Sequence, residues 1–393
     1  MTAPLAGVRI LAVEQYGAGP FGTQYLADMG AEVIKIENPR DGGDVARHVG
    51  PHFLEGTDPS VASLFFHGLN VGKKSVALDL ATPEGQRILH ELVKDADAVA
   101  CNLRGDVPEK LGLTYDQLKA HNPAIVCVHL TAYGREGPRK AWPGYDYLAQ
   151  AEAGYFAVTG EPGAPPSRMG LSVVDFMAGQ SLALAVVSGI TRARATGEGG
   201  EADVSLYDTA LYNLNYLATW YLNTGQEQGR NARSAHPSLT PCQLVTTADG
   251  WIYVMCNKEK FFGILCEMID RPDLAADPRF ADFEQRLLNR QSLSNLLDAA
   301  MATRSTDAWM ERFAGKVPAA PILSVAQALD APAAASRIED VDVDGSNVKR
   351  LAPSIRWKDF ARVATASPKL GADNAEILGA FRPAEGVGVV AAS

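Results

Sequence analysis

Short apolar runs alternate with segments of helical periodicity through the first third of the chain. The run Val8–Val13 is followed by a helical pattern that reaches Met29 and by a second strand-like run, Glu32–Glu37. The alternation continues with further strands and helical segments at Ser75–Leu80, Pro83–Lys94, Ala96–Cys101, Leu113–Ala120 and Ile125–Leu130. Strands that alternate with helices are typical of parallel sheets, so the pattern predicts an α/β fold with a doubly wound, largely parallel sheet.

The second half of the chain changes its pattern twice. A long helical segment, Phe176–Arg194, precedes a short strand, Ala202–Ser205, and an aromatic-rich helix, Tyr207–Asn223. Polar residues take over near Gln226, and the strands and helices of a smaller α+β domain follow. We therefore predict four regions: a large domain over 1–200, a linker helix over 201–225, a small α+β domain over 226–325, and a return segment over 326–393 that rejoins the large domain.

The composition is that of an ordinary globular protein. Of the 393 residues, 47% are hydrophobic and 21% are charged, which provides enough apolar material for a sizeable core. The formal net charge of -10 argues against nucleic acid and anionic membranes as partners, so any phosphate site needs a local group of basic residues. The pair Lys73–Lys74 is expected to lie in a solvated turn.

The cysteines and the hydropathy pattern indicate a compartment. Five cysteines, none in a C-x-x-C pair, predict reduced thiols in the core and neither a zinc site nor a disulfide framework. The first residues lack a basic region before their apolar run, and no stretch approaches the ~18 uninterrupted apolar residues of a membrane span. We expect a cytoplasmic protein without a metal ion or a membrane partner.

One carboxylate stands where the long helix begins. Asp175 directly precedes the helical segment that starts at Phe176, which predicts an N-cap whose side chain meets free backbone N–H groups. Two interpretations remain open. Asp175 is either only a cap, or a nucleophile that the helix dipole keeps ionised and ready to attack an electrophile.

A glycine-rich turn follows the first strand. Gly17, Gly19 and Gly22 form the pattern G-x-G-x-x-G, and Glu37 follows twenty positions after the first glycine, as in dinucleotide-binding folds. Close packing without any ligand explains the turn equally well. A second candidate region, Asn102–Arg104, comes at the carboxyl end of a strand, where α/β sheets bind ligands.

Taken in order, these segments resemble the family III CoA-transferases, of the formyl-CoA:oxalate and carnitine CoA-transferase type. The resemblance spans nearly the whole chain, and its motifs are Leu5–Leu11, Ala18–Pro20, Gly30–Glu37, Gly43–Val45, Lys73–Ser75, Asn102, Lys110–Gly112, Tyr145–Asp146, Asp175, Asp203–Asp208 and Pro318–Pro321. The family implies a Rossmann-like large domain made from both termini, an inserted small domain, and a homodimer of interlocked chains.

The resemblance also implies the residues of the site. Asp175 takes the position of the family's catalytic aspartate, and no permanently bound cofactor is expected, because coenzyme A or acyl-CoA is the substrate. Asn38 stands where arginine is common, so Arg40, Arg104 or Lys110 is expected to supply the charge for a phosphate. The implied CoA contacts are Gly17, Ala18, Asn38, Leu78, Ala81, Asn102, Leu103, Arg104, Lys110, Pro143, Gly144, Tyr145 and Asp146.

The implied reaction moves CoA from an acyl-CoA donor to a carboxylic acid. Asp175 attacks the donor thioester to give a mixed anhydride, and the CoA thiolate converts this anhydride into an aspartyl-CoA thioester. The acceptor acid then repeats the sequence in reverse. Backbone N–H groups of the loop around Gly17 are expected to stabilise the tetrahedral oxyanions.

Three arginines indicate the class of acid. Arg47, Arg168 and Arg233 are candidates to pair with a second carboxylate, which favours succinyl-CoA or other four- or five-carbon dicarboxylates, and a surface charge explains each of them equally well. The glycine run that closes over the intermediate in oxalate-type enzymes is replaced here by the stretch 233–241, which argues against oxalate as acceptor. His236, within that stretch, is expected to be a loop or packing residue.

Three alternatives remain open. A 2-methylacyl-CoA racemase or epimerase of the same fold abstracts a proton with a His and Asp pair, but Tyr145 stands at the histidine position, and an unperturbed tyrosine titrates near ~10. A nicotinamide-dependent oxidoreductase rests on the glycine pattern alone. A non-catalytic CoA-binding protein rests on Asp175 as a mere cap.

Overall fold

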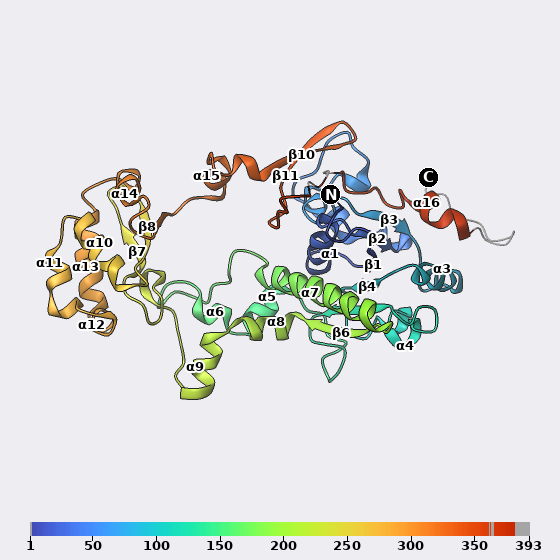
Figure 1. Ribbon diagram of the computed structural model, residues 1–393, viewed down its shortest axis with the longest axis horizontal. Coiled ribbons are helices and arrows are strands. Elements are labelled where there is room, and N and C mark those ends of the chain that lie inside the picture. Colours follow the sequence, from blue (N-terminus) through green and yellow to red (C-terminus); the bar gives the residue numbers. More distant parts are fainter. Residues whose placement is uncertain (1, 361, 363–364, 382–393) are drawn as a thin grey trace. The chain divides into compact units, whose positions relative to one another are not determined.

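The computed structural model describes residues 2–360, 362 and 365–381. The chain forms two compact units, each made from separate stretches of sequence (Figure 1). Unit 1 comprises Met1–Ala153, Gly170–Asn215 and Ser336–Ser393, and unit 2 comprises Gly154–Met169 and Tyr216–Ala335. Each unit has its own hydrophobic core.

Unit 1 is built on a six-stranded sheet in which every strand runs parallel to its neighbours. The order β3-β2-β1-β4-β5-β6 is that of a doubly wound sheet, so the α/β fold predicted from the alternating pattern is confirmed. Its strands are β1 (Arg9–Val13), β2 (Glu32–Glu37), β3 (Lys74–Ala77), β4 (Ala98–Cys101), β5 (Val126–Thr131) and β6 (Gly200–Ser205).

Helices connect the strands of this sheet. In α3, Thr82 caps the first turn by accepting a hydrogen bond from Gly85 N at 3.0 Å, and Pro83 occupies the first helical position, where no N–H is needed. The α-helices of unit 1 are α1 (Ala18–Asp28), α2 (Leu64–His67), α3 (Pro83–Lys94), α4 (Tyr115–Leu118), α5 (Asp146–Glu152), α7 (Val173–Thr196), α8 (Leu206–Asn213) and α16 (Asn374–Leu378). Its short 3-10 turns lie at Pro39–Asp41, Val45–His48, Pro59–Val61, Glu109–Leu111 and Gly379–Phe381.

The helices α1 and α7 pack backbone against backbone. A Cβ atom on Gly22 of α1 or on Gly179 of α7 would overlap the backbone of the other helix, so both positions need glycine. One turn earlier, Gly17 lies against Asp175. The two helices therefore start side by side and run in the same direction, which brings their N-terminal turns together.

Helix α7 is long and apolar enough to cross a bilayer. No other helix among the described residues is. In unit 1, however, α7 packs against α1, α8 and the strands β5 and β6. It buries one stripe of residues, with Asp175 in it, and it ends at Gly197, whose φ of 78° closes the helix. These contacts make α7 the central core helix of unit 1.

The last described segment joins the edge of the sheet beside β3 (red beside blue in Figure 1). Asp373 accepts a hydrogen bond from Ser75 N at 2.7 Å, and Asn374 accepts one from Ala77 N at 2.9 Å. Before it, β10 (Ile338–Val343) and β11 (Ser346–Leu351) form an antiparallel hairpin. Residues 382–393 of the predicted return segment lie outside the described residues.

Unit 2 combines a small antiparallel sheet with a group of helices. The sheet has the order β7-β8-β9, formed by Cys242–Thr246, Trp251–Met255 and Ala319–Pro321. Buried aromatic residues such as Trp309, Phe280 and Phe313 fill its core. The helices are α6 (Tyr155–Val158), α9 (Tyr216–Thr224), α10 (Glu259–Met268), α11 (Asp273–Ala276), α12 (Phe283–Leu288), α13 (Arg290–Met301), α14 (Thr306–Phe313) and α15 (Val325–Asp330), with 3-10 turns at Ala232–Ser234 and Pro278–Phe280. A further 3-10 turn, Ala335–Arg337, begins on the last residue of unit 2 and continues into unit 1.

Two parts of the predicted organisation differ from the structure. The linker helix expected over 201–225 is wrong: strand β6 is followed by α8 and α9, and Asn215 breaks the helix between them with a φ of 48°. The segment Gly154–Met169, expected in the large domain, belongs to unit 2. Arg230 ties it there by donating hydrogen bonds to the carbonyl oxygens of Phe156 and Pro165 at 3.2 and 3.1 Å.

Candidate active site

Asp175 lies in the first turn of α7, where it is the third helical residue. The cap position belongs to Ser172, whose side chain makes no capping hydrogen bond. The prediction that Asp175 is itself the N-cap is therefore wrong by three positions. Its side chain leaves the axis of α7 and reaches the start of α1, because Asp175 Oδ2 lies 2.8 Å from the point where a Cβ of Gly17 would be.

Asp146 supplies the missing cap from a distant part of the sequence. Its Oδ2 accepts hydrogen bonds from Val174 N at 2.7 Å and Asp175 N at 2.9 Å, and its Oδ1 accepts one from Gln150 at 2.6 Å. Asp146 is the first residue of α5 and only 4% exposed, while Tyr145 precedes it as the N-cap of α5. The side chain of Asp146 thus faces α7 instead of the cavity.

The electrostatic surroundings of Asp175 raise its proton affinity. Burial, which leaves the residue 8% exposed, and the nearby charge of Asp146 raise the pKa of the Asp175 carboxyl from 3.8 to about 7. In the described part of the chain, Asp175 forms no ion pair with a cation. The start of α7 was expected to keep Asp175 ionised, but it does not hold the pKa low, because Asp146 occupies the N–H groups that would have stabilised the charge; with a pKa of about 7 the carboxyl is only partly ionised at neutral pH.

The glycine pattern is explained by close approaches around Asp175. A side chain at Gly17 would meet Asp175, one at Gly19 would meet the side chain of Asn102 at 2.6 Å, and one at Gly22 would overlap α7. Ala18 and Gly19 lie in the first turn of α1, where backbone N–H groups have no partner within the helix. These N–H groups are therefore available beside Asp175.

Four buried charges hold the segment that precedes α1. Lys35 contacts Asp44 Oδ2 at 2.7 Å, and Lys73 donates to Glu14 Oε1 at 2.7 Å. Asp44 Oδ1 also accepts a hydrogen bond from the backbone of Tyr16 at 2.9 Å, which holds Tyr16 at a φ of 67°. We call Glu14, Lys35, Asp44 and Lys73 the anchoring cluster. The solvated turn predicted for Lys73 is wrong, because its ammonium group is buried among these partners.

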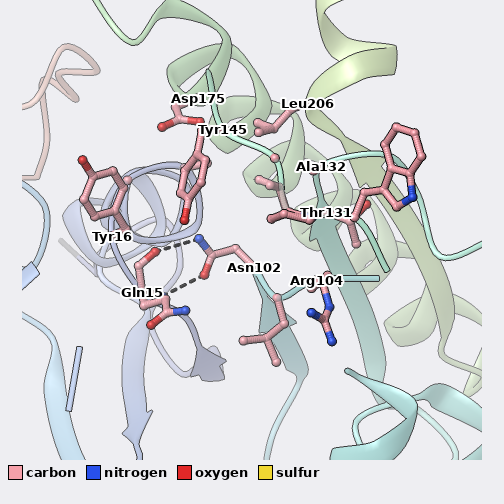
Figure 2. A pocket seen from close by; sticks show the side chains of 16 residues that line it. Gln15, Tyr16, Asn102, Arg104, Thr131, Ala132, Tyr145, Asp175 and Leu206 are labelled. Carbon is pink, nitrogen blue, oxygen red and sulfur yellow. Dashed lines mark hydrogen bonds between the residues drawn. The ribbon is translucent and has the colours of Figure 1, made fainter. Parts of the chain in front are cut away.

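A cavity of about 210 Å³ opens in front of Asp175 (Figure 2). Figure 2 shows Asp175 at one end beside Tyr16 and Tyr145, and Arg104 toward the other end. Asn102 and Gln15 join two of its walls by reciprocal hydrogen bonds of 2.8 Å. The lining residues are Gln15, Tyr16, Gly17, Ala18, Asn102, Leu103, Arg104, Leu130, Thr131, Ala132, Trp142, Pro143, Gly144, Tyr145, Asp175 and Leu206.

This cavity brings together most, but not all, of the residues named from the sequence. Asn38, Leu78 and Ala81 line a separate apolar hollow of about 100 Å³. Lys110 lines a third hollow, of about 450 Å³, together with Lys140. All of these hollows are formed by unit 1 alone.

The predicted cations are present but already have acidic neighbours. Arg40 pairs with Asp79 at 2.8 Å. Arg104 and Lys110 both pair with Asp106, at 2.5 and 2.6 Å, and they hold the pKa of the Asp106 carboxyl well below its usual range. A phosphate would therefore compete with these carboxylates for the three cations.

One acidic and one basic residue singled out from the sequence form an ion pair with each other. Glu37 and Arg47 form a fully buried pair, with Arg47 Nη2 at 2.6 Å and Nε at 2.8 Å from the two carboxylate oxygens. Glu37 is therefore unavailable to the ribose of a dinucleotide, and the oxidoreductase interpretation loses its second residue. Arg47 is equally unavailable to a substrate carboxylate, so that prediction is wrong.

The other proposed substrate contacts lie in unit 2. Arg233 pairs with Asp298, and Arg168 donates to the carbonyl oxygen of Met169 at 3.0 Å. His236 accepts a hydrogen bond from Leu239 N at 3.1 Å through Nδ1, as suits the loop residue expected from the sequence. None of these three lines the cavity around Asp175.

Several lining residues were missed from the sequence. Thr131 ends β5 and Ala132 follows it, and Leu206 follows β6. The rule that singled out Asn102 at the end of β4 applies equally to the neighbouring strand, so the end of β5 was a signal that could have been used. No sequence signal connected Asp146 with the start of α7.

Comparisons with known proteins find the same family over nearly the full length of this chain. A sequence model of the family described as "CoA-transferase family III" matches residues 5–374. The succinate–glutarate CoA-transferase of Agrobacterium fabrum is 33% identical over 386 residues, which cover 95% of each chain. The acetyl-CoA:oxalate CoA-transferase of Acetobacter aceti is 31% identical over 385 residues, or 97% of each chain. The crystal structure of a CaiB/BaiF family protein from Brucella suis matches with a TM-score of 0.82 and 32% identity, covering 97% of this chain and 100% of that one.

Proposed function

The chain belongs to family III of the CoA-transferases and is an acyl-CoA:carboxylate transferase, and from this premise we propose that it carries CoA between two acids on Asp175. The observation that carries the proposal is a buried carboxylate without a cation, facing a cavity and lying against the first turn of α1. A carboxylate whose pKa is raised to about 7 is a stronger nucleophile than an ordinary aspartate, and it is still substantially ionised at neutral pH.

The proposed reaction conserves the thioester bond energy through covalent intermediates. Asp175 attacks the carbonyl carbon of the donor, the C–S bond breaks, and CoA leaves as a thiolate, giving a mixed anhydride. The thiolate attacks the aspartyl carbonyl and releases the donor acid, giving an aspartyl-CoA thioester. The acceptor carboxylate attacks this thioester and expels CoA as a thiolate, which gives a second mixed anhydride. The thiolate then attacks the acceptor's acyl carbonyl, so that the acceptor leaves as its CoA thioester and the carboxylate of Asp175 is released.

The first turn of α1 is proposed to stabilise the oxyanions of these steps. The N–H groups of Ala18 and Gly19 have no partner within the helix, and Gly17, the residue just before them, lies against Asp175. In each tetrahedral intermediate a negative oxygen is attached to the reacting carbon, which is either the acyl carbon that Asp175 attacks or the carboxyl carbon of Asp175 itself. Helix N-terminal N–H groups are suited to that charge, because they are oriented before the reaction begins.

The remaining residues are proposed to bind CoA. The thioester end lies in the cavity of Asp175, among Gly17, Ala18, Asn102, Leu103, Arg104, Pro143, Gly144 and Tyr145. Asn38, Leu78 and Ala81 offer an apolar hollow, and Arg40, Arg104 and Lys110 offer positive charge to phosphates. No permanent cofactor is needed, since CoA enters and leaves as part of the substrate.

The acids are proposed to be dicarboxylates of four or five carbons, with succinyl-CoA as donor. Succinate and glutarate are the acids in the printed name of the Agrobacterium relative, and oxalate, in that of the Acetobacter relative, is also a dicarboxylate. This class now rests on those relatives, because Arg47 is buried in its pair with Glu37. If only monocarboxylates react in a panel of acids, the dicarboxylate assignment falls.

A homodimer of interlocked chains is part of the proposal. Leu184 on α7 is 69% exposed, and Tyr212 and Leu222, on α8 and α9, are more exposed still. Large apolar side chains in such numbers are normally covered, and a second copy of the chain would cover them. A measured solution mass of one chain, 41.9 kDa, would contradict the dimer.

A cytoplasmic location is also part of the proposal. The cysteines are free and buried in the described chain, as is usual for proteins of that reducing compartment.

Replacing Asp175 by alanine tests the function directly. Transfer of CoA from succinyl-CoA to a panel of carboxylic acids is followed by mass spectrometry. We expect the Asp175→Ala variant to lose at least about a thousandfold in kcat, because the covalent route is removed. Asp116→Ala, at a side chain that is 82% exposed, is the matched control and should transfer CoA normally. Turnover by Asp175→Ala near the wild-type rate would exclude the proposal.

One observation keeps a second function under test. A carboxyl with a pKa of about 7 also suits a general base that removes the proton alpha to a thioester, as in the racemases of this fold. Tyr145, at the position of the racemase histidine, lines the same cavity. Appearance of solvent deuterium at C2 of an acyl-CoA, with no acceptor acid present, would identify racemisation. Transfer without such exchange identifies the transferase.

A further inference from the structure

Two buried carboxylates lie at the first turn of α7: Asp175 belongs to that turn, and Asp146 contacts it from α5. Asp146 accepts the N–H groups of Val174 and Asp175 at 2.7 and 2.9 Å, and Asp175 itself projects toward Gly17. Both side chains are almost inaccessible to water. Water therefore screens their mutual repulsion poorly, and the repulsion is largest when both carboxylates are charged.

The other groups around Asp175 leave this repulsion uncompensated. From the loop before α1 comes Tyr16, from the residue before α5 comes Tyr145, and from the segment after β4 comes Arg104. Arg104 is engaged with Asp106 at 2.5 Å. The elements β5 and α8, and the first turn of α1, present only non-titratable residues to the cavity, namely Leu130, Thr131, Leu206, Gly17 and Ala18.

From this arrangement, and resting on the proposed transferase reaction, we propose that Asp146 is a positioning residue that fixes the first turn of α7 and opposes the negative charge of Asp175. Nothing in the cavity requires Asp146 to touch CoA, since its two carboxylate oxygens already accept three hydrogen bonds from the protein. Its role in the reaction is exerted through Asp175.

The repulsion favours the covalent intermediates. When Asp175 becomes an anhydride, its negative charge passes to the CoA thiolate, and when it becomes a thioester, the charge leaves the protein with the released acid. The free enzyme therefore contains two opposed carboxylates, whereas the aspartyl-CoA form contains only one. The same free energy that raises the proton affinity of Asp175 shifts the acylation equilibrium toward the intermediate, because protonation and acylation both neutralise it.

The test is Asp146→Asn, which keeps an oxygen to accept the N–H groups of α7 and removes the charge. Without the repulsion the pKa of Asp175 falls. The acidic limb of kcat/KM for transfer from succinyl-CoA to glutarate, where activity appears as Asp175 ionises, should then move down by about one pH unit. Glu152→Gln, which removes one charge from the same helix at the surface, should leave the limb in place. An unmoved limb in Asp146→Asn, even with a lower rate, would reduce Asp146 to a structural cap and overturn the proposal.

A second readout measures the intermediate itself. With succinyl-CoA and no acceptor, rapid quenching and mass spectrometry give the fraction of protein that carries CoA on Asp175. A shift of one pKa unit corresponds to about tenfold in an equilibrium constant, so the ratio of aspartyl-CoA form to free enzyme should be about tenfold lower in Asp146→Asn than in wild type. An equal ratio in the two proteins would contradict the proposal.

A third measurement separates this inference from the proposed function. The 13C resonance of the Asp175 carboxyl, assigned by its absence in Asp175→Asn, is titrated in the free protein without any substrate. It should titrate at lower pH in Asp146→Asn, or in Asp146→Ser if the asparagine variant does not fold. If wild type transfers no CoA in any pairing, the proposed function fails while this titration still decides the role of Asp146. If wild type transfers CoA and the titration is unchanged by the substitution, only the inference on Asp146 fails.

Discussion

Unit 1 buries two groups of charged side chains close to the same glycine loop, and the two are organised in opposite ways. In the anchoring cluster, two lysines face two carboxylates, and Lys73 also donates to Pro20 O at 2.9 Å. At the start of α7, two buried carboxylates lie near each other, and neither has an ion pair with a cation among the described residues. Paired charges of the first kind hold a structure in place. In the second kind the unpaired charges raise the pKa of a carboxyl, which makes it a better nucleophile.

The loop Gln15–Gly17 connects the two groups. The backbone of Tyr16 is held by Asp44 of the anchoring cluster, and the next residue, Gly17, lies against Asp175. The pKa of Lys35 stays raised although burial alone would lower it, because Asp44, Glu14 and Glu37 surround it. The difference teaches that a buried charge is informative about function only once its partners have been counted.

Removing one lysine from the anchoring cluster should produce the largest loss of stability. Lys35→Met leaves Asp44 buried without its cation, so we expect the free energy of unfolding in urea to fall by about 3–5 kcal/mol. Lys74→Met is the matched control. Lys74 pairs with Glu32 and Glu376 at a partly exposed site, and its loss should cost less than about 1 kcal/mol. Equal losses in the two variants would mean that the cluster does not anchor the loop.

Widening the contact between α1 and α7 should have the next largest effect. Gly22→Ala places a methyl group against the backbone of Gly179, which has no side chain that could move away. We expect a loss of about 2–3 kcal/mol and a lower kcat, because Gly17 would move relative to Asp175. Gly263→Ala, in α10 where a Cβ meets nothing within 4 Å, should be neutral or stabilising by up to about 1 kcal/mol. A Gly22→Ala variant as stable and active as Gly263→Ala would exclude the close approach.

Much of the fold could be predicted because it is encoded locally. The apolar run at Ile125–Leu130 became β5, Val126–Thr131, and the pattern over Pro83–Lys94 became α3 with those bounds. Each such element carries its own periodicity, and alternation of strands and helices then implies the parallel sheet. The break at Asn215 was missed, because the residues on either side of it are all compatible with one continuous helix.

The candidate site was less predictable, because its properties depend on residues distant in sequence. Asp175 was identified, but its charge state depends on its burial in the fold and on Asp146, which lies 29 positions away. Lys73 looked like a surface residue until Glu14 was placed beside it. In both cases a residue type predicts the local role and cannot reveal the partner, which only the folded chain supplies.

The smallest predicted effect tests the unpaired side of the comparison, and its sign is opposite to that of Lys35→Met. Folding raises the pKa of Asp175 from 3.8 to about 7, so above pH 7 the folded protein holds a charge that the unfolded chain carries more easily. Asp175→Asn removes that charge without changing the size of the side chain. We expect it to be more stable than wild type at pH 8, by about 1–2 kcal/mol, because the buried amide offsets part of the larger gain expected from the pKa shift alone.

The advantage of Asp175→Asn should shrink as the pH falls from 7 toward 4, because wild-type Asp175 then becomes neutral in the folded protein while the unfolded chain is still ionised. Melting temperatures of the two proteins across that range measure it, with Asp116→Asn as the exposed control, which should show no such trend. A difference that stays constant with pH would mean that Asp175 is not opposed by its surroundings. A difference that follows the titration would show that the protein gives up stability to keep this carboxylate reactive, whereas the charge of Lys35 in the anchoring cluster, whose pKa is raised by its carboxylate neighbours, contributes stability.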